Sequence, residues 1–168
     1  ENPLYAEARR LLEVKKIKTI VLKEGDMIGG FDSVKLRVLN PPADKKFSIP
    51  NDNSLVIRLD KGNFSALLCG DIMNEAAKNL LLTENENLGS IFLKVPHHGG
   101  SMGDIAGDFL MKINPKAALI SARGKKVDSH ILLILKELGT KIYSTDINGA
   151  VSLETENNNW RIRQFIQN

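Results

Sequence analysis

The stretches LLCGD (residues 67–71) and LKVPHHGGS (residues 93–101) each run from apolar residues into side chains that can bind a metal ion. An aspartate follows the first predicted strand, and a pair of histidines follows the second. If the two strands are neighbours in a sheet, their ends place carboxylate and imidazole ligands on one rigid edge. The two stretches therefore predict half of a metal site.

The composition is that of one globular domain over residues 1–168. Apolar residues make up 42% of the chain and charged residues 26%, so the chain can bury a substantial core. Its 23 basic and 20 acidic residues give a net charge of +3, and no block of like charge indicates a nucleic-acid-binding tail. A single cysteine excludes an internal disulfide and a multi-cysteine zinc site. No apolar stretch approaches the roughly 20 residues that span a bilayer.

Hydrophobic periodicity and turn residues divide the chain into helices and strands. A tight turn at residues 60–63 joins two of the strands into a hairpin. The helices are predicted over residues 3–15, 73–82, 105–112 and 130–138, and the strands over residues 18–23, 34–38, 55–59, 64–69, 91–95, 116–121, 141–144, 150–154 and 160–165. Because hairpins are mixed with strand–helix alternation, this order predicts an α/β (α+β) fold with helices on an outer face of the sheets.

The first residues carry a helix signal. The chain opens with Glu1, and Asn2 is a candidate cap ahead of Pro3 at the first helical position. We therefore expect the chain to be processed, trimmed or excised from a longer protein. A segment ahead of Glu1 would then hold the missing half of the metal site.

Five polar side chains at element ends are candidates for chemistry, and each has a structural alternative. Asp71 can bind metal ions or cap the helix that follows it. His97 and His98 point in different directions, so that one can ligate a metal while the other faces substrate or packs; alternatively, one bonds the backbone and the other is exposed. His130 begins a helix whose dipole keeps the ring neutral, and it can ligate a metal, accept a proton or be merely exposed. Ser101 can contact phosphate or water, or belong to an ordinary loop.

Basic side chains near the histidines leave a further alternative open. Lys94, Arg123, Lys125 and Lys126 can line a groove for a phosphate backbone or form a solvated basic loop. Cys69 lies within an apolar run and is expected to be a buried structural thiol. The chain has no glycine-rich phosphate loop with a Gly-Lys-Ser/Thr motif and no Gly-x-Ser-x-Gly elbow, so two other common kinds of catalytic site find no support.

Four motifs in a fixed order together carry a family resemblance. They are NDNSLVIRL (residues 51–59), LLCGDI (67–72), LKVPHHG (93–99) and SH (129–130), and the segment YSTDINGA (143–150) suits the same pattern. The chain resembles the metallo-beta-lactamase superfamily, and more narrowly the carboxy-terminal hydrolase domain of the ComEC/Rec2 competence proteins. It is similar to the carboxy-terminal part of that domain, because the family's His-x-His-x-Asp-His motif is absent from the sequence.

The resemblance implies a metallo-beta-lactamase-like αββα sandwich, incomplete at its amino terminus, with one or two divalent metal ions, zinc or manganese, at one edge of the sheets. It implies that Asp71 and His97 are metal ligands and that His98, Ser101 and His130 lie near the site as catalytic candidates. The implied reaction is attack of metal-activated hydroxide on a phosphodiester, with DNA as the substrate. By the same resemblance the domain faces outward on a multi-span membrane protein or is a soluble stand-alone relative.

The sequence departs from the family pattern at two further positions. Gly100 stands where the family has a serine, with Ser101 one place later. Ile131 replaces the proline expected after His130, which changes the local loop and its contact with substrate.

Two classes of function fit this sequence. The first is a metal-dependent phosphodiesterase or DNA nuclease domain, expected to be inactive as this fragment because Asp71 with one or two histidines makes at best a weak site. The second is a non-catalytic binding or assembly domain whose exposed sheet edges pair with another copy to form a homo-oligomer. Within the enzyme class, hydrolysis of a small ester or phosphodiester stays open because fold alone does not fix function.

Overall fold

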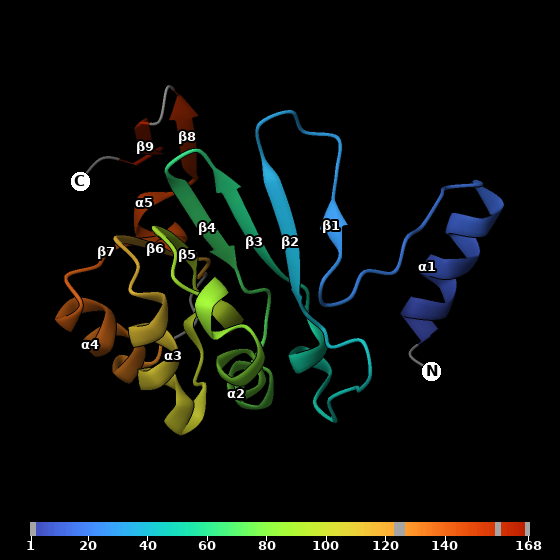
Figure 1. Ribbon diagram of the computed structural model, residues 1–168, viewed down its shortest axis with the longest axis horizontal. Coiled ribbons are helices and arrows are strands. Elements are labelled where there is room, and N and C mark those ends of the chain that lie inside the picture. The colour runs from blue at the N-terminus through green and yellow to red at the C-terminus, as the bar shows by residue number, and fades with distance from the viewer. Residues whose placement is uncertain (1–2, 123–126, 157–158, 167–168) are drawn as a thin grey trace.

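A computed structural model describes residues 3–122, 127–156 and 159–166 of the chain. Its main sheet holds seven strands whose order in the sheet is their order in the sequence (Figure 1). These strands are β1 (Met27–Ile28), β2 (Lys35–Asn40), β3 (Val56–Lys61), β4 (Phe64–Leu68), β5 (Phe92–Lys94), β6 (Ala117–Ile120) and β7 (Lys141–Ser144). Strands β1 to β4 pair antiparallel, whereas β4 to β7 pair parallel.

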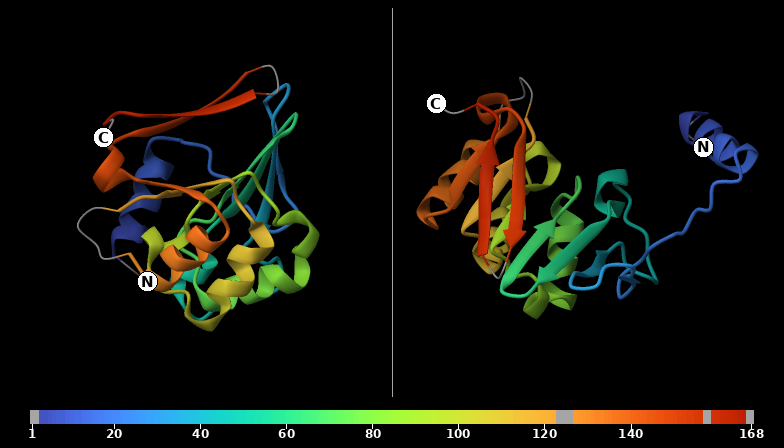
Figure 2. Two further views of the ribbon diagram at one scale, coloured as in Figure 1. Left: turned by 90° about the vertical axis from the view of Figure 1, so that its left-hand side faces the viewer. Right: turned by 90° about the horizontal axis from the view of Figure 1, so that it is seen from above.

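Helices and a hairpin cover opposite faces of the main sheet (Figure 2). The helices are α2 (Asn74–Thr83), α3 (Ala106–Ile113) and α4 (Ser129–Glu137), and each connects two parallel strands. Parallel strands need such crossovers, because a tight turn cannot return the chain to the same end of the sheet. The hairpin consists of β8 (Val151–Glu156) and β9 (Asn159–Gln164), which form a separate two-stranded sheet. This arrangement confirms the mixed α/β class that the sequence predicts.

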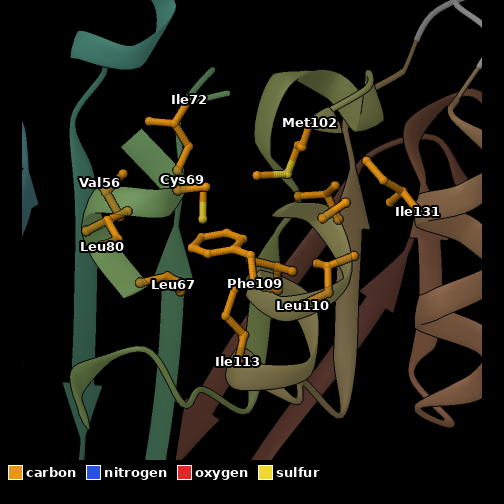
Figure 3. Close-up of a cluster of buried hydrophobic side chains, with 14 of the residues drawn as sticks. Val56, Leu67, Cys69, Ile72, Leu80, Met102, Phe109, Leu110, Ile113 and Ile131 are labelled. Carbon is orange, nitrogen blue, oxygen red and sulfur yellow. The ribbon is translucent and has the colours of Figure 1, made fainter. Parts of the chain in front are cut away.

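The main hydrophobic core lies between the sheet and helices α2 to α4. Phe109 of α3 is fully buried and lies among the apolar side chains of strand β4 and of its own helix (Figure 3). A second, smaller cluster occupies the other face of the sheet, where Phe64, Phe92 and Tyr143 meet the β8–β9 hairpin. In that cluster the rings of Phe64 and Trp160 lie 6.2 Å apart, so the hairpin is held by aromatic packing.

The β3–β4 hairpin forms where the sequence predicts it. Its register pairs Lys61 with Phe64, and the connecting turn includes Gly62 with a φ of +55°, a conformation that glycine adopts without strain. Ahead of this hairpin, the Asn53 side chain holds the approaching loop. Its amide accepts from Phe47 N at 3.0 Å and donates to the carbonyl oxygens of Phe47 and Ile49. Asn53, at the end of the short 3-10 helix Pro50–Asn53, thus fixes the backbone of residues 47–49, as expected for asparagine in turns.

The strand predicted over residues 18–23 does not form. The residues on which the prediction depended, Ile20 and Val21, are 71% and 93% exposed, and this segment is irregular in the structure. β-branched residues favour a pleated, half-buried surface, but a strand also needs a neighbour that accepts its backbone hydrogen bonds. No strand of the described residues lies beside this segment, so the prediction was wrong for this structure.

Helix α1 (Pro3–Val14) confirms the predicted amino-terminal helix, but it buries no side chain against the rest of the described residues. None of its residues is buried, and Figure 1 shows it standing away from the body of the chain. An amphipathic helix of this length normally gains its stability by burying an apolar face. Together, α1 and residues 15–22 form an exposed segment that we call the amino-terminal arm.

The position of Phe109 gives a test of the core. Replacement of Phe109 by alanine should lower the free energy of unfolding by about 3–5 kcal/mol, because the lost ring leaves a cavity under the sheet. Met111 lies on the same helix but is 55% exposed, so Met111→Ala should change the unfolding free energy by less than about 0.5 kcal/mol. Urea unfolding followed by circular dichroism measures both values. Equal losses for the two variants would contradict the assigned core.

Candidate functional site

Two neighbouring parallel strands bring the two predicted metal-binding stretches together. Strands β4 and β5 pair in register, with Leu67 opposite Leu93, so both chains leave the sheet at the same edge. A backbone hydrogen bond then joins the loops beyond the strands, from His97 N to Gly70 O at 3.2 Å. The carboxyl ends of parallel strands are where α/β proteins commonly bind ligands. The expectation of adjacent strand ends is therefore confirmed.

Gly70 is required by the close approach of this loop to the segment before β3. Its φ is +54°, and a β-carbon placed on it would lie 2.8 Å from Ser54 Cβ and 3.0 Å from Leu55 O. No larger residue fits without moving the backbone, and side chains also disfavour this φ. The glycine before Asp71 thus fixes the direction in which the aspartate leaves the strand.

His98 is the histidine that faces Asp71. Its Nε2 lies 3.6 Å from Asp71 Oδ1, and the two side chains are 41% and 44% exposed, so a small ligand can reach both. Its other ring nitrogen, Nδ1, lies 2.8 Å from the carbonyl oxygen of Ser121, which follows β6. Because a carbonyl can only accept, Nδ1 of the neutral ring carries the proton, and Nε2 keeps its lone pair for another partner.

His97 points elsewhere, on a strained backbone. Its Nδ1 is buried and has no hydrogen-bond partner among the described residues. His97 and His98 have φ values of 47° and 54°, a left-handed conformation that side chains rarely adopt and that is typical of functional loops. A β-carbon on Gly100 would lie 2.9 Å from His97 Nδ1, which gives a physical reason for glycine at this position rather than the serine expected from the resemblance.

In the described part of the chain, Ser101 and His130 form no side-chain hydrogen bond or ion pair with Asp71 or the histidine pair. Ser101 is exposed, and its hydroxyl accepts from Gly103 N at 3.3 Å. His130 is exposed in the first turn of α4, where Asp128 is the helix cap and accepts from His130 N at 2.8 Å. Asp128 N donates in turn to Gly99 O at 2.8 Å, so the start of α4 lies beside the histidine loop. Their predicted catalytic roles stay predictions.

Asp52 supports the site and was missed by the sequence analysis. It is fully buried, and its Oδ1 accepts from Met73 N at 2.7 Å and from Ala76 N at 3.2 Å. It therefore caps α2 from a distance, whereas Asp71 does not cap it, and the capping alternative for Asp71 was wrong. In the sequence, Asp52 looks like an ordinary turn residue. Its contacts reach across about twenty positions, so no local pattern indicates them.

The structure describes Cys69 but not all of the basic residues predicted near the site. Cys69 is fully buried, and desolvation raises the pKa of its thiol to about 12, so it is the structural cysteine that the sequence predicts. Arg123, Lys125 and Lys126 lie outside the described residues. Within residues 3–122, 127–156 and 159–166, no group of three or more histidine, cysteine, aspartate or glutamate side chains is arranged to hold a metal ion.

No family model matches the chain. Individual proteins, however, are similar to it in sequence. The chain is 32% identical over 141 residues to ComE operon protein 3 of Bacillus subtilis, a match that covers 81% of this chain and 18% of that protein. It is 27% identical over 125 residues to the competence protein ComA of Neisseria gonorrhoeae, covering 72% and 18% of the two chains.

One solved structure is similar to this chain in its fold. It is a crystal structure from Parabacteroides distasonis described as that of a candidate metal-dependent hydrolase, with a TM-score of 0.54 and 15% identity over 80% of this chain and 60% of the other. This chain is ComEC-like and of the metallo-beta-lactamase type.

The ComEC-like relationship concerns a part of much longer proteins. The chain spans less than a fifth of the length of either competence protein. Among the helices in the described part of the chain, none has the length and apolar character needed to cross a membrane.

The cap on α2 can be tested by removing the Asp52 carboxylate. Asp52→Ala should lower the free energy of unfolding by about 2 kcal/mol, because two backbone N–H groups at the start of α2 lose their acceptor. Asp104→Ala removes an exposed carboxylate and should have a much smaller effect. Thermal or urea unfolding gives both values, and an Asp52→Ala protein as stable as the Asp104→Ala control would show that the buried carboxylate does not hold the helix.

Proposed function

We propose that this chain contributes part of a metal-dependent site that hydrolyses phosphodiester bonds. The observation that carries the proposal is the position of His98 Nε2, which lies 3.6 Å from Asp71 Oδ1 while Nδ1 of the same ring is held by Ser121 O. The relationship to competence proteins and the fold shared with a candidate metal-dependent hydrolase support it.

The two donors fit a shared divalent cation. Zinc binds nitrogen and oxygen ligands at about 2.0–2.2 Å in tetrahedral geometry, which separates two ligand atoms by roughly 3.3–3.6 Å. The distance between His98 Nε2 and Asp71 Oδ1 lies at the upper end of that range. The proton on His98 Nδ1, held by Ser121 O, is the outer hydrogen bond that metal-binding histidines usually make. A divalent cation bound here would supply Lewis acidity toward a phosphoryl oxygen and would favour ionisation of water.

The surrounding residues set the geometry of these donors. Gly70 O holds the backbone of His97, and Ser121 O fixes the ring of His98, so the His98 ring does not need to reorient when a substrate binds. His97, with its unpartnered Nδ1, stays in the proposal as a further ligand after a change of ring orientation. Ser101 and His130 stay in it as contacts to substrate or water.

Two donors are too few for a tight site, and we propose that further ligands come from a His-x-His-x-Asp-His segment ahead of residue 1. Catalytic zinc sites commonly use three protein ligands and keep a position open for water. On this proposal the 168-residue chain by itself has little activity, and the complete domain acts on DNA or on a small phosphodiester. The choice of zinc or manganese depends on the ligands supplied by that segment.

The exposed amino-terminal arm favours a second candidate function, in assembly. Tyr5, Val14, Ile20 and Val21 are all more than half exposed, although such residues normally bury their side chains. Residues 17–22 also have the composition of a strand without a partner. A second copy of the chain is one surface that can cover them, by pairing along an open sheet edge.

The metal site is tested first on the 168-residue chain. Asp71→Asn and His98→Gln should each weaken binding of Zn²⁺ or Mn²⁺ by roughly tenfold or more, because the first removes the negative charge and the second removes the imidazole nitrogen. Asp108→Asn removes an exposed carboxylate on α3 and should leave metal affinity unchanged. Calorimetric titration measures the affinities.

The activity test uses a protein that includes the proposed His-x-His-x-Asp-His segment ahead of residue 1. It is assayed with each metal on a single-stranded oligonucleotide and on bis(p-nitrophenyl) phosphate. Asp71→Asn and His98→Gln should abolish hydrolysis, and His97→Ala tests the ligand role of His97. Unchanged metal affinity in both Asp71→Asn and His98→Gln would remove the basis of the proposed site. Activity that survives His97→Ala would remove His97 from it.

The assembly candidate makes a separate prediction about mass. Light scattering should show a concentration-dependent dimer for the chain, and deletion of residues 1–22 should give a monomer, because the unpartnered apolar side chains are removed. A second variant, in which Ile17, Ile20 and Val21 are replaced by threonine, keeps the chain length and is the match for the deletion. A monomer at all concentrations before any change would contradict a role in self-assembly.

A further inference from the structure

Lys94 is a charged residue in an otherwise apolar row that crosses the sheet. On the face opposite the helices, Leu68 of β4 lies opposite Lys94 of β5, Lys94 opposite Leu119 of β6, and Leu119 opposite Tyr143 of β7. This row is near the carboxyl ends of the strands, directly before the loops that carry Asp71 and His98. A lysine at such a position places a cation beside the proposed metal site.

The β8–β9 hairpin covers only one end of this row, and its cover ends near Lys94. Tyr143 is only 7% exposed under the β8–β9 hairpin, whereas Leu68 at the other end of the row is 37% exposed. The side chain of Lys94 is partly buried between them. Solvent and small ligands therefore reach the row from the β4 side, which is the strand that leads into Asp71.

The ammonium group is directed to the edge of the sheet. Its Nζ donates to Val95 O at 3.0 Å, one residue further toward the histidines, and it has no other hydrogen-bond partner among the described residues. An ammonium has three donors, so two are available to a ligand. Burial lowers the pKa of Lys94, while the negative charge of Asp71 acts in the opposite direction. A partly desolvated cation is costly without an anionic partner.

We propose that Lys94 is a phosphate-binding residue of this site, whose ammonium holds a non-bridging oxygen of a phosphodiester beside Asp71 and His98. The proposal rests on the proposed function, since it assigns the substrate contact of the same site. Lysine is a compact point charge that suits phosphate, and a contact made in a partly desolvated position is stronger than one in open water. The same contact serves DNA and a small phosphodiester, because both present the same anionic group.

Arg58, another basic residue on the sheet, already has hydrogen-bond partners. Arg58 of β3 forms an ion pair with Asp60 at 2.8 Å and donates to the carbonyl oxygens of Asn87 and Gly89. Lys116, by contrast, is an exposed lysine just before β6, at the amino ends of the parallel strands and therefore at the opposite edge from the site. It offers a control with the same change of charge.

The test measures binding of a fluorescein-labelled oligothymidylate to the 168-residue chain by fluorescence anisotropy, in EDTA, so that the result does not depend on any metal. Lys94→Gln should weaken binding roughly tenfold, and Lys94→Arg should restore most of it. The slope of log affinity against log salt should become shallower by about 0.7, as expected for one lost phosphate contact. Lys116→Gln should change affinity much less. Equal losses for Lys94→Gln and Lys116→Gln would overturn the proposal.

Chemical labelling of the wild-type chain tests the contact without any substitution. Labelling of Lys94 by acetic anhydride, read by peptide mass spectrometry, should fall when oligothymidylate or bis(p-nitrophenyl) phosphate is added, while labelling of Lys116 stays constant. Protection by both ligands indicates recognition of the phosphodiester itself, and protection by the oligonucleotide alone indicates a nucleic-acid site. Absence of protection by either would overturn the proposal even if Lys94→Gln fails to fold.

Metal titration of Lys94→Gln distinguishes failure of this inference from failure of the proposed function. Removal of a nearby positive charge should leave Zn²⁺ affinity equal or slightly tighter, whereas general damage to the loops would weaken it. Loss of oligonucleotide binding with retained Zn²⁺ affinity supports the phosphate contact. Unchanged oligonucleotide binding in Lys94→Gln, in a protein that still binds Zn²⁺ through Asp71 and His98, would refute Lys94 while leaving the metal site intact.

Discussion

The parallel pairing of β4 with β5 is the constraint on which the site depends. It sends two loops from one edge of the sheet, and the hydrogen bond from His97 N to Gly70 O then joins them. Gly70 permits the approach, because its backbone passes too close to Ser54 and Leu55 for a side chain. The edge of a packed sheet moves little, so side chains that start from it keep their relative positions. Asp71 and His98 meet for this reason.

The histidine loop stores strain that the surrounding backbone contacts offset. Two consecutive residues in the left-handed region cost on the order of 1–3 kcal/mol each. Hydrogen bonds from three other segments hold them there, through Gly70 O, Ser121 O and the bond from Asp128 N to Gly99 O. Asp52 stabilises the start of α2 by accepting from the N-cap Met73, two residues after Asp71. The candidate site is thus a meeting point of β4, β5, β6 and α4, and its parts become fixed only together.

Much of the fold follows from local pattern. The β3–β4 hairpin could be predicted because alternating apolar residues flank a turn with a glycine, and both features act over a few positions. The strand expected at residues 18–23 shows where such reasoning ends. Ile20 and Val21 have the intrinsic preference for a strand, but strand formation needs a partner, and local sequence contains no information about whether one is adjacent. The role of Asp52 could not be predicted for the same reason, because its contacts are with the distant residues Met73 and Ala76.

The sequence by itself determined that a carboxylate and two imidazoles follow two buried strands, because the apolar runs end directly in Gly70-Asp71 and Pro96-His97-His98. It also determined that the single cysteine is buried. Only the tertiary structure decided which histidine faces Asp71. Adjacent residues point in different directions, and their orientation depends on the carbonyl groups of Gly70 and Ser121, which follow strands β4 and β6. Side-chain direction at a strand end is a property of the assembled sheet, since its hydrogen bonds exist only once the strands have paired.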